Sequence, residues 1–268
     1  MWFQAALQGI VQGLTEFLPV SSSAHLILAR AFFGWDDQAF GTAFDVAVHV
    51  GTLLAVVLYF APELAQLARA VPRILAPQAD ASARQLRLLV VGTLPLVPVG
   101  LLYTDQVEQA VRTPGVAAVM LGVGGACLWL ADRRGSRERS EDALTLPQAF
   151  GLGLAQAAAL VPGVSRSGAT MTVALLFGLR REAAARFSFL LGVPAILAAA
   201  SLTLVDALDA GLPPGATPVF LVGVVTSGVV GYLTVKYFLR YVSANSLGGF
   251  AYYRFVLAGA TGLWLLLA

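Results

Sequence analysis

Long apolar stretches alternate with short polar segments along most of this chain. A helix rises about 1.5 Å per residue, so about 20 consecutive apolar residues cross the roughly 30 Å hydrocarbon core of a bilayer. Six stretches come close to this length, at residues 42–60, 86–103, 115–131, 187–205, 218–235 and 250–267. The pattern predicts six membrane-spanning helices.

Two further apolar segments are interrupted. The first covers residues 2–18, breaks at residues 19–23 and resumes only through 25–33. The second covers residues 146–161, breaks at 162–170 and resumes only to 179. Each predicts a re-entrant hairpin, two half-helices whose irregular tip lies inside protein, because lipid cannot satisfy free backbone groups. The expected fold class is an all-α integral membrane protein with six transmembrane helices and two re-entrant hairpins.

The composition agrees with a membrane environment. Only 12% of the residues are charged, 58% are hydrophobic and the mean hydropathy is +0.78, so most surfaces must face lipid or one another. The formal net charge of +2 gives no reason to expect nucleic acid as a partner. Cys127 has no second cysteine to pair with, and we interpret it as a helix-packing residue. We expect a single membrane domain over residues 1–268.

The positive charges predict the orientation of the helices. Of the 17 lysines and arginines, 14 follow the first, third and fifth predicted spans and the second broken segment. They are Arg69, Arg73, Arg84, Arg87, Arg133, Arg134, Arg137, Arg139, Arg180, Arg181, Arg186, Lys236, Arg240 and Arg254. Arg30 and Arg112 lie on the opposite side, and Arg166 lies in the membrane. Because cytoplasmic loops carry an excess of Lys and Arg, both termini are expected outside.

This orientation gives the two halves of the chain opposite topologies. The first hairpin would enter from the outer face and the second from the cytoplasmic face, each followed by three spans. Short matches support a repeat at an offset of 144: Gly9-Ile10-Val11-Gln12 with Gly153-Leu154-Ala155-Gln156, and Ser21-Ser22-Ser23 with Ser165-Arg166-Ser167. We predict an inverted repeat of residues 1–131 and 146–268, joined by a basic cytoplasmic loop at 132–145. Many secondary transporters have this architecture.

The first broken segment carries polar groups that need a reason to be in a membrane. Gln12 and Glu16 are spaced i,i+4, so they share one face of a helix and offer oxygens to a divalent cation, Mg²⁺ or Ca²⁺. Water and substrate oxygens would supply the remaining ligands. The alternative is a helix-packing hydrogen bond with a protonated Glu16.

Three serines precede the second half of this hairpin. Ser21, Ser22 and Ser23 are candidate N-caps. A half-helix that starts near Ser22 or Ser23 points its free N–H groups and positive dipole end into the protein, where they favour an anion. His25 lies within one turn of Ser22 and is a candidate base, acid or proton relay. A purely structural role for His25 is the alternative.

The second tip repeats this arrangement and adds a guanidinium. Arg166 lies between Ser165 and Ser167 in an apolar stretch, where a charge costs about 2.5–3.5 kcal/mol on insertion scales. Its planar fork suits two phosphate oxygens. Gly168 permits close backbone approach, and Thr170 adds a hydroxyl as the next half-helix begins. If the two hairpins meet, their tips together predict a phosphate site beside lipid.

Two other features suggest supporting roles. Asp45 and His49 are spaced i,i+4 and could pair with each other or line the site. A run of small residues at 223–228 predicts close helix packing.

The candidate residues belong to two long motifs. The first is Gln12-Gly13-Leu14-Thr15-Glu16-Phe17-Leu18-Pro19-Val20-Ser21-Ser22, followed by His25. The second is Pro162-Gly163-Val164-Ser165-Arg166-Ser167-Gly168-Ala169-Thr170. Both resemble the signatures of the bacterial undecaprenyl-diphosphatase family, the bacitracin-resistance type. The likeness covers essentially the whole chain, because span number, hairpin positions and length agree.

The resemblance implies an enzyme. It implies removal of one phosphate from undecaprenyl diphosphate, which gives the monophosphate lipid carrier for cell-wall (peptidoglycan) synthesis. It also implies dependence on a divalent cation, a bacterial plasma (inner) membrane location and a site facing the periplasmic or external side. The expected partners are the polyprenyl diphosphate substrate and membrane lipid, and a homodimer is left open.

The resemblance also assigns roles by position. Glu16 corresponds to the invariant acid of the family's Glu/Gln-x-x-x-Glu motif and Gln12 to its variable first member. A glutamine at position 12 weakens any scheme in which two carboxylates hold the metal. Ser22 falls at the candidate nucleophile, His25 at the motif histidine and Arg166 at the phosphate-binding arginine. Further phosphate contacts are expected from Ser21, Ser23, Ser165, Ser167, Gly168 and Thr170.

Two mechanisms fit these assignments. In one, Ser22 assisted by His25 attacks the terminal phosphorus and water later releases phosphate. In the other, His25 or Glu16 activates water directly. An inverted-repeat transporter or flippase for a phosphorylated lipid or anion is the alternative function, because it would show the same broken helices and charge pattern.

Overall fold

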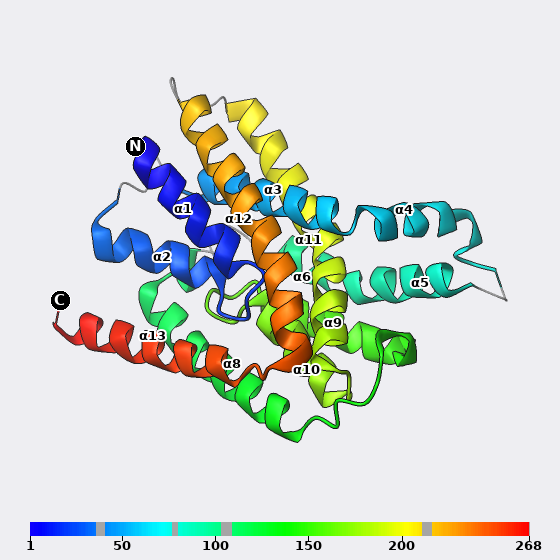
Figure 1. The fold of residues 1–268 in the computed structure, drawn as a ribbon. Coiled ribbons are helices and arrows are strands. Elements are labelled where there is room, and N and C mark those ends of the chain that lie inside the picture. The colour runs from blue at the N-terminus through cyan, green and yellow to red at the C-terminus, as the bar shows by residue number, and fades with distance from the viewer. Residues whose placement is uncertain (36–40, 77–79, 103–108, 211–215, 268) are drawn as a thin grey trace.

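The computed structural model describes residues 1–35, 41–76, 80–102, 109–210 and 216–267. These residues are helical throughout, with short connections and no β-strand among them (Figure 1). The helices are α1 (Trp2–Thr15), α2 (Ser22–Phe33), α3 (Thr42–Tyr59), α4 (Ala61–Ala70), α5 (Ala81–Thr93), α6 (Leu96–Leu102), α8 (Pro114–Arg134), α9 (Leu146–Ala158), α10 (Arg166–Leu176), α11 (Arg181–Ala210), α12 (Ala216–Ala244) and α13 (Gly248–Leu267). Two short 3₁₀ helices lie at Val71–Arg73 and Glu141–Ala143. The all-helical prediction is confirmed for the described residues.

Several helices are long and apolar enough to cross a membrane. Within the described ranges there are five such spans: Ala81–Leu102, Pro114–Arg134, Arg181–Ser201, Thr217–Ala244 and Gly248–Leu267. The stretch predicted at 42–60 forms α3, and it reaches the required length and hydropathy only together with the helix that follows. That pair, Ala43–Tyr59 and Ala61–Arg73, is bent by 81°. Pro62 in the first turn of α4 fits this break, because proline cannot donate a backbone hydrogen bond to a continuing helix.

The two interrupted segments form helical pairs, as their sequences predict. In the first, α1 ends at Thr15 and α2 begins at Ser22. In the second, α9 ends at Ala158 and α10 begins at Arg166. Proline and serine occur in both breaks, and the second break also contains Gly163; there the backbone leaves the helical path.

Small residues allow α1, α3 and α12 to pack closely. A side chain at Gly51 of α3 would collide with Ser227 and with the backbone of Val224 in α12. A side chain at Gly13 of α1 would lie 2.8 Å from the backbone of Ser227 and Gly231. The packing predicted for residues 223–228 is confirmed. In Figure 1, α1 runs along α12 near the centre of the molecule, and α1 ends where the first hairpin breaks.

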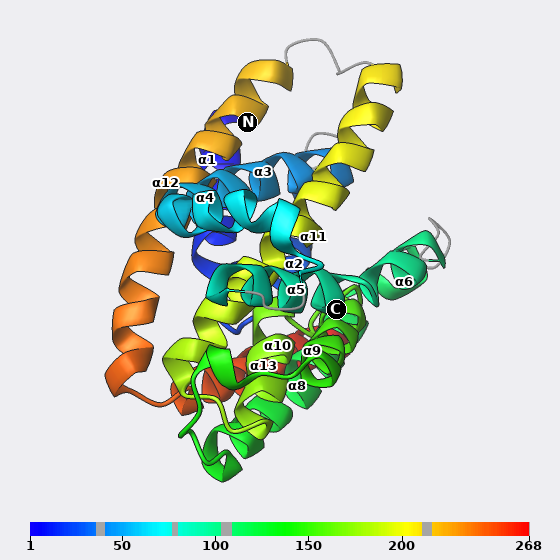
Figure 2. The ribbon, with the colours of Figure 1, turned by 90° about the vertical axis from the view of Figure 1, so that its right-hand side faces the viewer.

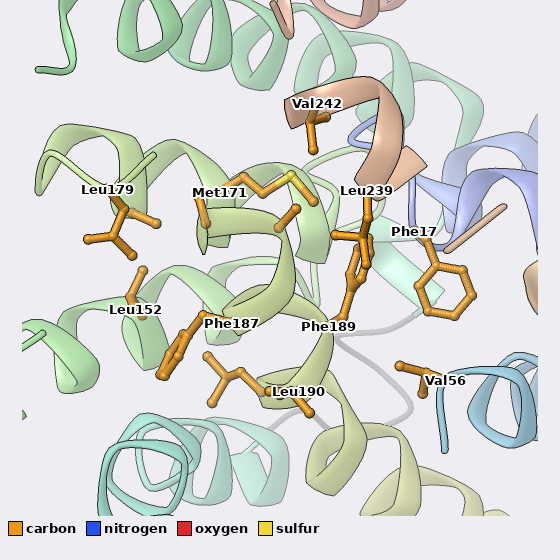
Figure 3. Packing of buried hydrophobic residues seen from close by; sticks show 14 of the residues in the cluster. Phe17, Val56, Leu152, Met171, Leu179, Phe187, Phe189, Leu190, Leu239 and Val242 are labelled. Carbon is orange, nitrogen blue, oxygen red and sulfur yellow. The ribbon is translucent and has the colours of Figure 1, made fainter. Parts of the chain in front are cut away.

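The largest apolar core lies behind the two tips. It joins Phe17, just after α1, to Met171 of α10 and Phe189 of α11, and the rings of Phe17 and Phe189 meet edge to face at 5.2 Å between centroids (Figure 3). In Figure 2, α9 and α10 lie below α11, while α4 and α5 extend alongside one another. This packing fixes the residues of the hairpin breaks relative to α10 and α11, as a functional site with a defined geometry requires.

Cys127 is exposed on α8. The interpretation of this residue as a helix-packing residue was wrong, because its side chain is exposed and not buried between helices.

Candidate active site

The two hairpin breaks end in matching turns. Ser21 and Ser165, 144 positions apart, are the N-caps of α2 and α10, with φ of 73° and 71°. Such positive φ values are uncommon for residues other than glycine and mark local strain that the surrounding structure must hold. The Oγ of Ser21 accepts from the Ala24 amide at 3.5 Å, and that of Ser165 accepts from the Gly168 amide at 3.1 Å.

The two tips touch each other. The backbone amide of Gly163 donates to Ser21 Oγ at 3.2 Å, and Ser167 Oγ donates to the Leu18 carbonyl at 3.0 Å. Serine pairs also form within each tip, with Ser21 and Ser23 oxygens 3.2 Å apart and those of Ser165 and Ser167 3.3 Å apart. The structure therefore brings the two motifs together, and the starts of α2 and α10 lie at one place.

Glu16 lies at the centre of this place and is buried. Its Oε1 accepts from Arg166 at 2.7 Å. Its Oε2 accepts from Ser22 Oγ at 2.6 Å and from Gln12 Nε2 at 3.0 Å. The ring of His49 adds Nε2 at 3.4 Å from the same oxygen. One carboxylate thus joins the serine of the first tip to the arginine of the second.

In the ion pair of Arg166 and Glu16, Arg166 is the more exposed residue. Its side chain keeps 17% of its surface exposed, against 5% for Glu16. Besides Glu16 it donates to the Gly192 carbonyl of α11 at 2.8 Å, and any side chain at Gly192 would collide with the guanidinium. An incoming anion can therefore reach a guanidinium that is already oriented, and the fork of Arg166 matches phosphate geometry.

His25 does not contact the Ser22 hydroxyl. Its Nδ1 donates to the Ser21 carbonyl at 2.7 Å, and its Nε2 lies 2.7 Å from the Tyr253 hydroxyl, with the two rings stacked. The expected pairing of His25 with Ser22 is therefore replaced by the pair of Ser22 and Glu16. The reason is helical direction, because a side chain leans back toward the residue four positions earlier, here Ser21.

The other predicted contacts brace the tips. The Thr170 hydroxyl donates to the Arg166 carbonyl at 2.8 Å and meets Ser188 of α11, so it stabilises the start of α10. The absence of a side chain at Gly168 leaves room for Arg254, because an added Cβ atom would lie 2.8 Å from a guanidinium nitrogen of Arg254. Both residues lie near the start of α10, and the Gly168 amide and the Thr170 hydroxyl are hydrogen bonded within the protein.

Sequence reasoning missed Arg254. This side chain of α13 is fully buried. It donates to carbonyls of Pro19 in the first tip, Gly163 and Val164 in the second, and Met120 and Leu121 in α8, at 2.9–3.2 Å. Its assignment to a cytoplasmic group of charges was wrong, because the side chain is buried inside the protein between the two tips and α8. A charge within the apolar stretch 250–267 was the signal, the same one that identified Arg166.

A second charged cluster adjoins the site. Arg30 donates to both oxygens of Asp45, at 2.7 and 2.8 Å, and Arg112 also pairs with Asp45. The Asp45 carbonyl accepts from His49 Nδ1 at 2.6 Å. His49 therefore links this cluster to Glu16, which agrees with the supporting role predicted for Asp45 and His49.

One acceptor at the site has no hydrogen-bond partner. Gln12 Oε1 is buried without one, next to the Glu16 carboxylate. A free amide oxygen beside a carboxylate is the kind of donor pair that Mg²⁺ and Ca²⁺ accept. The described residues contain no group of three or more His, Cys, Asp or Glu placed to hold a metal ion. Gln12 and Glu16 fit a cation that takes its other ligands from water and substrate.

Comparisons with known proteins agree with the two motifs. The family model described as bacitracin resistance protein BacA matches residues 5–260. The chain belongs to the BacA family. An undecaprenyl-diphosphatase of Rubrobacter xylanophilus is 48% identical over 267 residues, covering 98% of both chains. Undecaprenyl-diphosphatases of Geotalea daltonii and Alcanivorax borkumensis are 45% and 44% identical, covering 94% and 98% of this chain and 94% and 99% of the relatives. The matched residues include both segments that meet at Glu16.

Proposed function

We propose that this BacA-family chain is an undecaprenyl-diphosphate phosphatase of the bacterial plasma membrane. It would release inorganic phosphate and return the monophosphate carrier to peptidoglycan synthesis, which accounts for bacitracin resistance. Relatives of nearly equal length carry the name of this activity. The observation that carries the proposal is the Glu16 carboxylate, hydrogen bonded at once to the Ser22 hydroxyl and the Arg166 guanidinium.

The residues suggest how the phosphate would be bound. Arg166 exchanges Glu16 for oxygens of the diphosphate, and the free N–H groups at the starts of α2 and α10 face the added negative charge. Ser165 and Ser167 keep the second tip in its strained turn. The donors are fixed before substrate arrives, so little reorganisation is needed during the reaction.

The chemical step then involves Ser22. Its Oγ forms a bond to the terminal phosphorus while the bond from that phosphorus to the bridging oxygen breaks, and the polyprenyl phosphate leaves. The hydroxyl proton passes to Glu16, which lies 2.6 Å away. Water then attacks the phosphoserine, releases phosphate and restores the hydroxyl. Direct attack by water with Glu16 as the base uses the same residues without a covalent intermediate.

A divalent cation would be held by Gln12 Oε1 and Glu16. When bound, it would neutralise phosphate charge and so favour departure of the polyprenyl phosphate. The cation would share the Glu16 carboxylate with its hydrogen-bond donors Gln12, Ser22 and Arg166.

The proposed topology has six spans and two re-entrant hairpins in inverted halves, with both termini outside. It is supported by the matched turns at Ser21 and Ser165 and by the buried amides of Gln12 and Gln156, also 144 positions apart. In this arrangement the site opens to the periplasmic or external side.

Rapid-quench kinetics with terminal-phosphate-labelled undecaprenyl diphosphate tests the function and the nucleophile. The purified wild-type chain should release phosphate and carry transient label. Ser22→Ala should lose at least about 100-fold in kcat while still binding substrate, whereas Arg166→Ala should lose both. Absence of phosphate release both with and without added Mg²⁺ or Ca²⁺ would overturn the phosphatase proposal and favour transport. Release without any labelled protein would instead establish attack by water.

A further inference from the structure

An open groove of about 450 Å³ lies beside the first tip. Its walls come from the end of the first hairpin's α1 and from the junction of α12 and α13. They include Leu14, Thr15 and Leu18 on one side and Tyr241, Phe250 and Tyr253 on the other. Leu14, Tyr241 and Tyr253 are each more than a third exposed, so the groove is open along its length. None of the described residues that line it is charged.

The groove and the polar site share a wall. The ring of Tyr253 lines the groove, while its hydroxyl contacts His25 Nε2 at 2.7 Å. Thr15 lines the groove and directly precedes Glu16. Val20 lines it and directly precedes Ser21, the N-cap of α2. The groove therefore borders the first tip, and Glu16 next to this tip is hydrogen bonded to Arg166.

We propose that this groove binds the first few isoprenoid units of the polyprenyl diphosphate. The inference rests on the proposed function, and it specifies the path by which the lipid chain leaves the active site. The lining is apolar and aromatic, as an unsaturated branched chain requires, and the volume lies within the roughly 300–1,000 Å³ usual for small-ligand sites. The rest of a long chain would extend along the open side into lipid.

The aromatic wall is built to hold its shape. Phe250 packs edge to face against Tyr241 at 5.7 Å and Phe238 at 5.5 Å between ring centroids. Tyr253 is fixed by stacking on His25. Rigid rings present a binding surface with little loss of side-chain entropy on binding, so the groove favours a defined start of the chain rather than any acyl chain.

Gly249 gives a clean way to fill the groove. It lines the groove, and a side chain added there meets no atom within 4 Å. Gly259, ten positions further along the same helix, has equally open surroundings and lies outside the groove. Gly249→Leu should therefore block the groove without disturbing packing, and Gly259→Leu is the matched control.

Steady-state hydrolysis of diphosphates of one, three and eleven isoprenoid units tests the inference. Gly249→Leu should raise KM at least about fivefold for the three- and eleven-unit substrates and leave kcat/KM for the one-unit substrate within about twofold. Gly259→Leu should change none of them. Equal effects of Gly249→Leu on all three lengths, or no effect on any, would overturn the inference. Failure of the wild type to hydrolyse any of them would instead reject the phosphatase function.

A second measurement does not depend on any variant. A three-unit diphosphate analogue with a photoreactive diazirine on its second unit should label the wild-type chain at Leu14, Leu18 or residues 241–253. Excess undecaprenyl diphosphate should suppress this labelling, whereas excess phospholipid of the same vesicles should not. Labelling confined to other helices, or suppression by phospholipid alone, would contradict an isoprenoid site.

Discussion

At the scale of single residues, Arg254 holds the two motifs in place. It is a fully buried cation whose described hydrogen-bond partners are all backbone carbonyls, from both tips and from α8. Carbonyls at a broken helix have lost their helical donors, and leaving them unsatisfied in a buried site costs about 1–3 kcal/mol each. The guanidinium satisfies several of them at once, which a shorter or less branched side chain cannot do.

We therefore expect Arg254→Lys to lower the free energy of unfolding by at least about 3 kcal/mol and to reduce kcat. Arg240→Lys, an exposed change on α12, should have little effect on either. Thermal unfolding in detergent and phosphate release measure both quantities. An Arg254→Lys chain as stable as the wild type would show that the tips hold their turns without this side chain.

Gln12 offers a test of the cation at the same scale. Gln12→Glu places a second carboxylate next to Glu16, where the present amide leaves one buried oxygen without a partner. Two carboxylates bind a hard cation more tightly than one, so the Mg²⁺ or Ca²⁺ concentration for half-maximal activity should fall about tenfold. Titration of EDTA-treated protein measures it, with the conservative Gln148→Glu on α9, away from Glu16, as control. An unchanged midpoint would place the cation elsewhere.

At the scale of elements, glycine contacts determine how closely α1, α3 and α12 approach. Gly51→Ala should destabilise the protein by about 1–3 kcal/mol, because its methyl group would collide with backbone atoms of α12 that cannot move aside. Gly259→Ala on α13 meets open space and should be neutral or slightly stabilising. Thermal unfolding of the two variants in the same detergent compares them. Equal midpoints would mean that α3 and α12 can separate without cost.

The helices themselves could be predicted from the sequence, because length and hydropathy determine where a chain can cross lipid. The tips could also be predicted, since serine and proline interrupt apolar helices in a recognisable way. The contacts between residues far apart in the sequence could not be predicted. His25 and Tyr253 lie 228 positions apart, and nothing in the pattern of either segment places one ring on the other. The bend after α3 is also tertiary, because the hydropathy pattern alone predicts only a span there.

At the scale of the whole molecule, the charge pattern and the structure can be compared. In Figure 1 both termini lie on the same side, whereas α4 and α5 extend away on the other side. The sequence places 14 basic residues in four groups along the chain. In three of these groups the residues lie at the surface or in connections, whereas Arg254 of the fourth group is buried. Without Arg254 the remaining basic residues are still distributed asymmetrically, so the location of both termini outside stays a prediction of the positive-inside rule.

Single-cysteine labelling tests this orientation. In a Cys127→Ser background, Trp2→Cys should react with a membrane-impermeant maleimide in intact spheroplasts, because Trp2 is exposed at the end of α1 that is predicted to lie outside. Glu138→Cys, exposed in the connection between α8 and α9, should react only after the membrane is permeabilised. The reverse pattern would place both termini in the cytoplasm. It would also move the opening of the site to the cytoplasmic face, since both hairpins would then enter from the opposite sides.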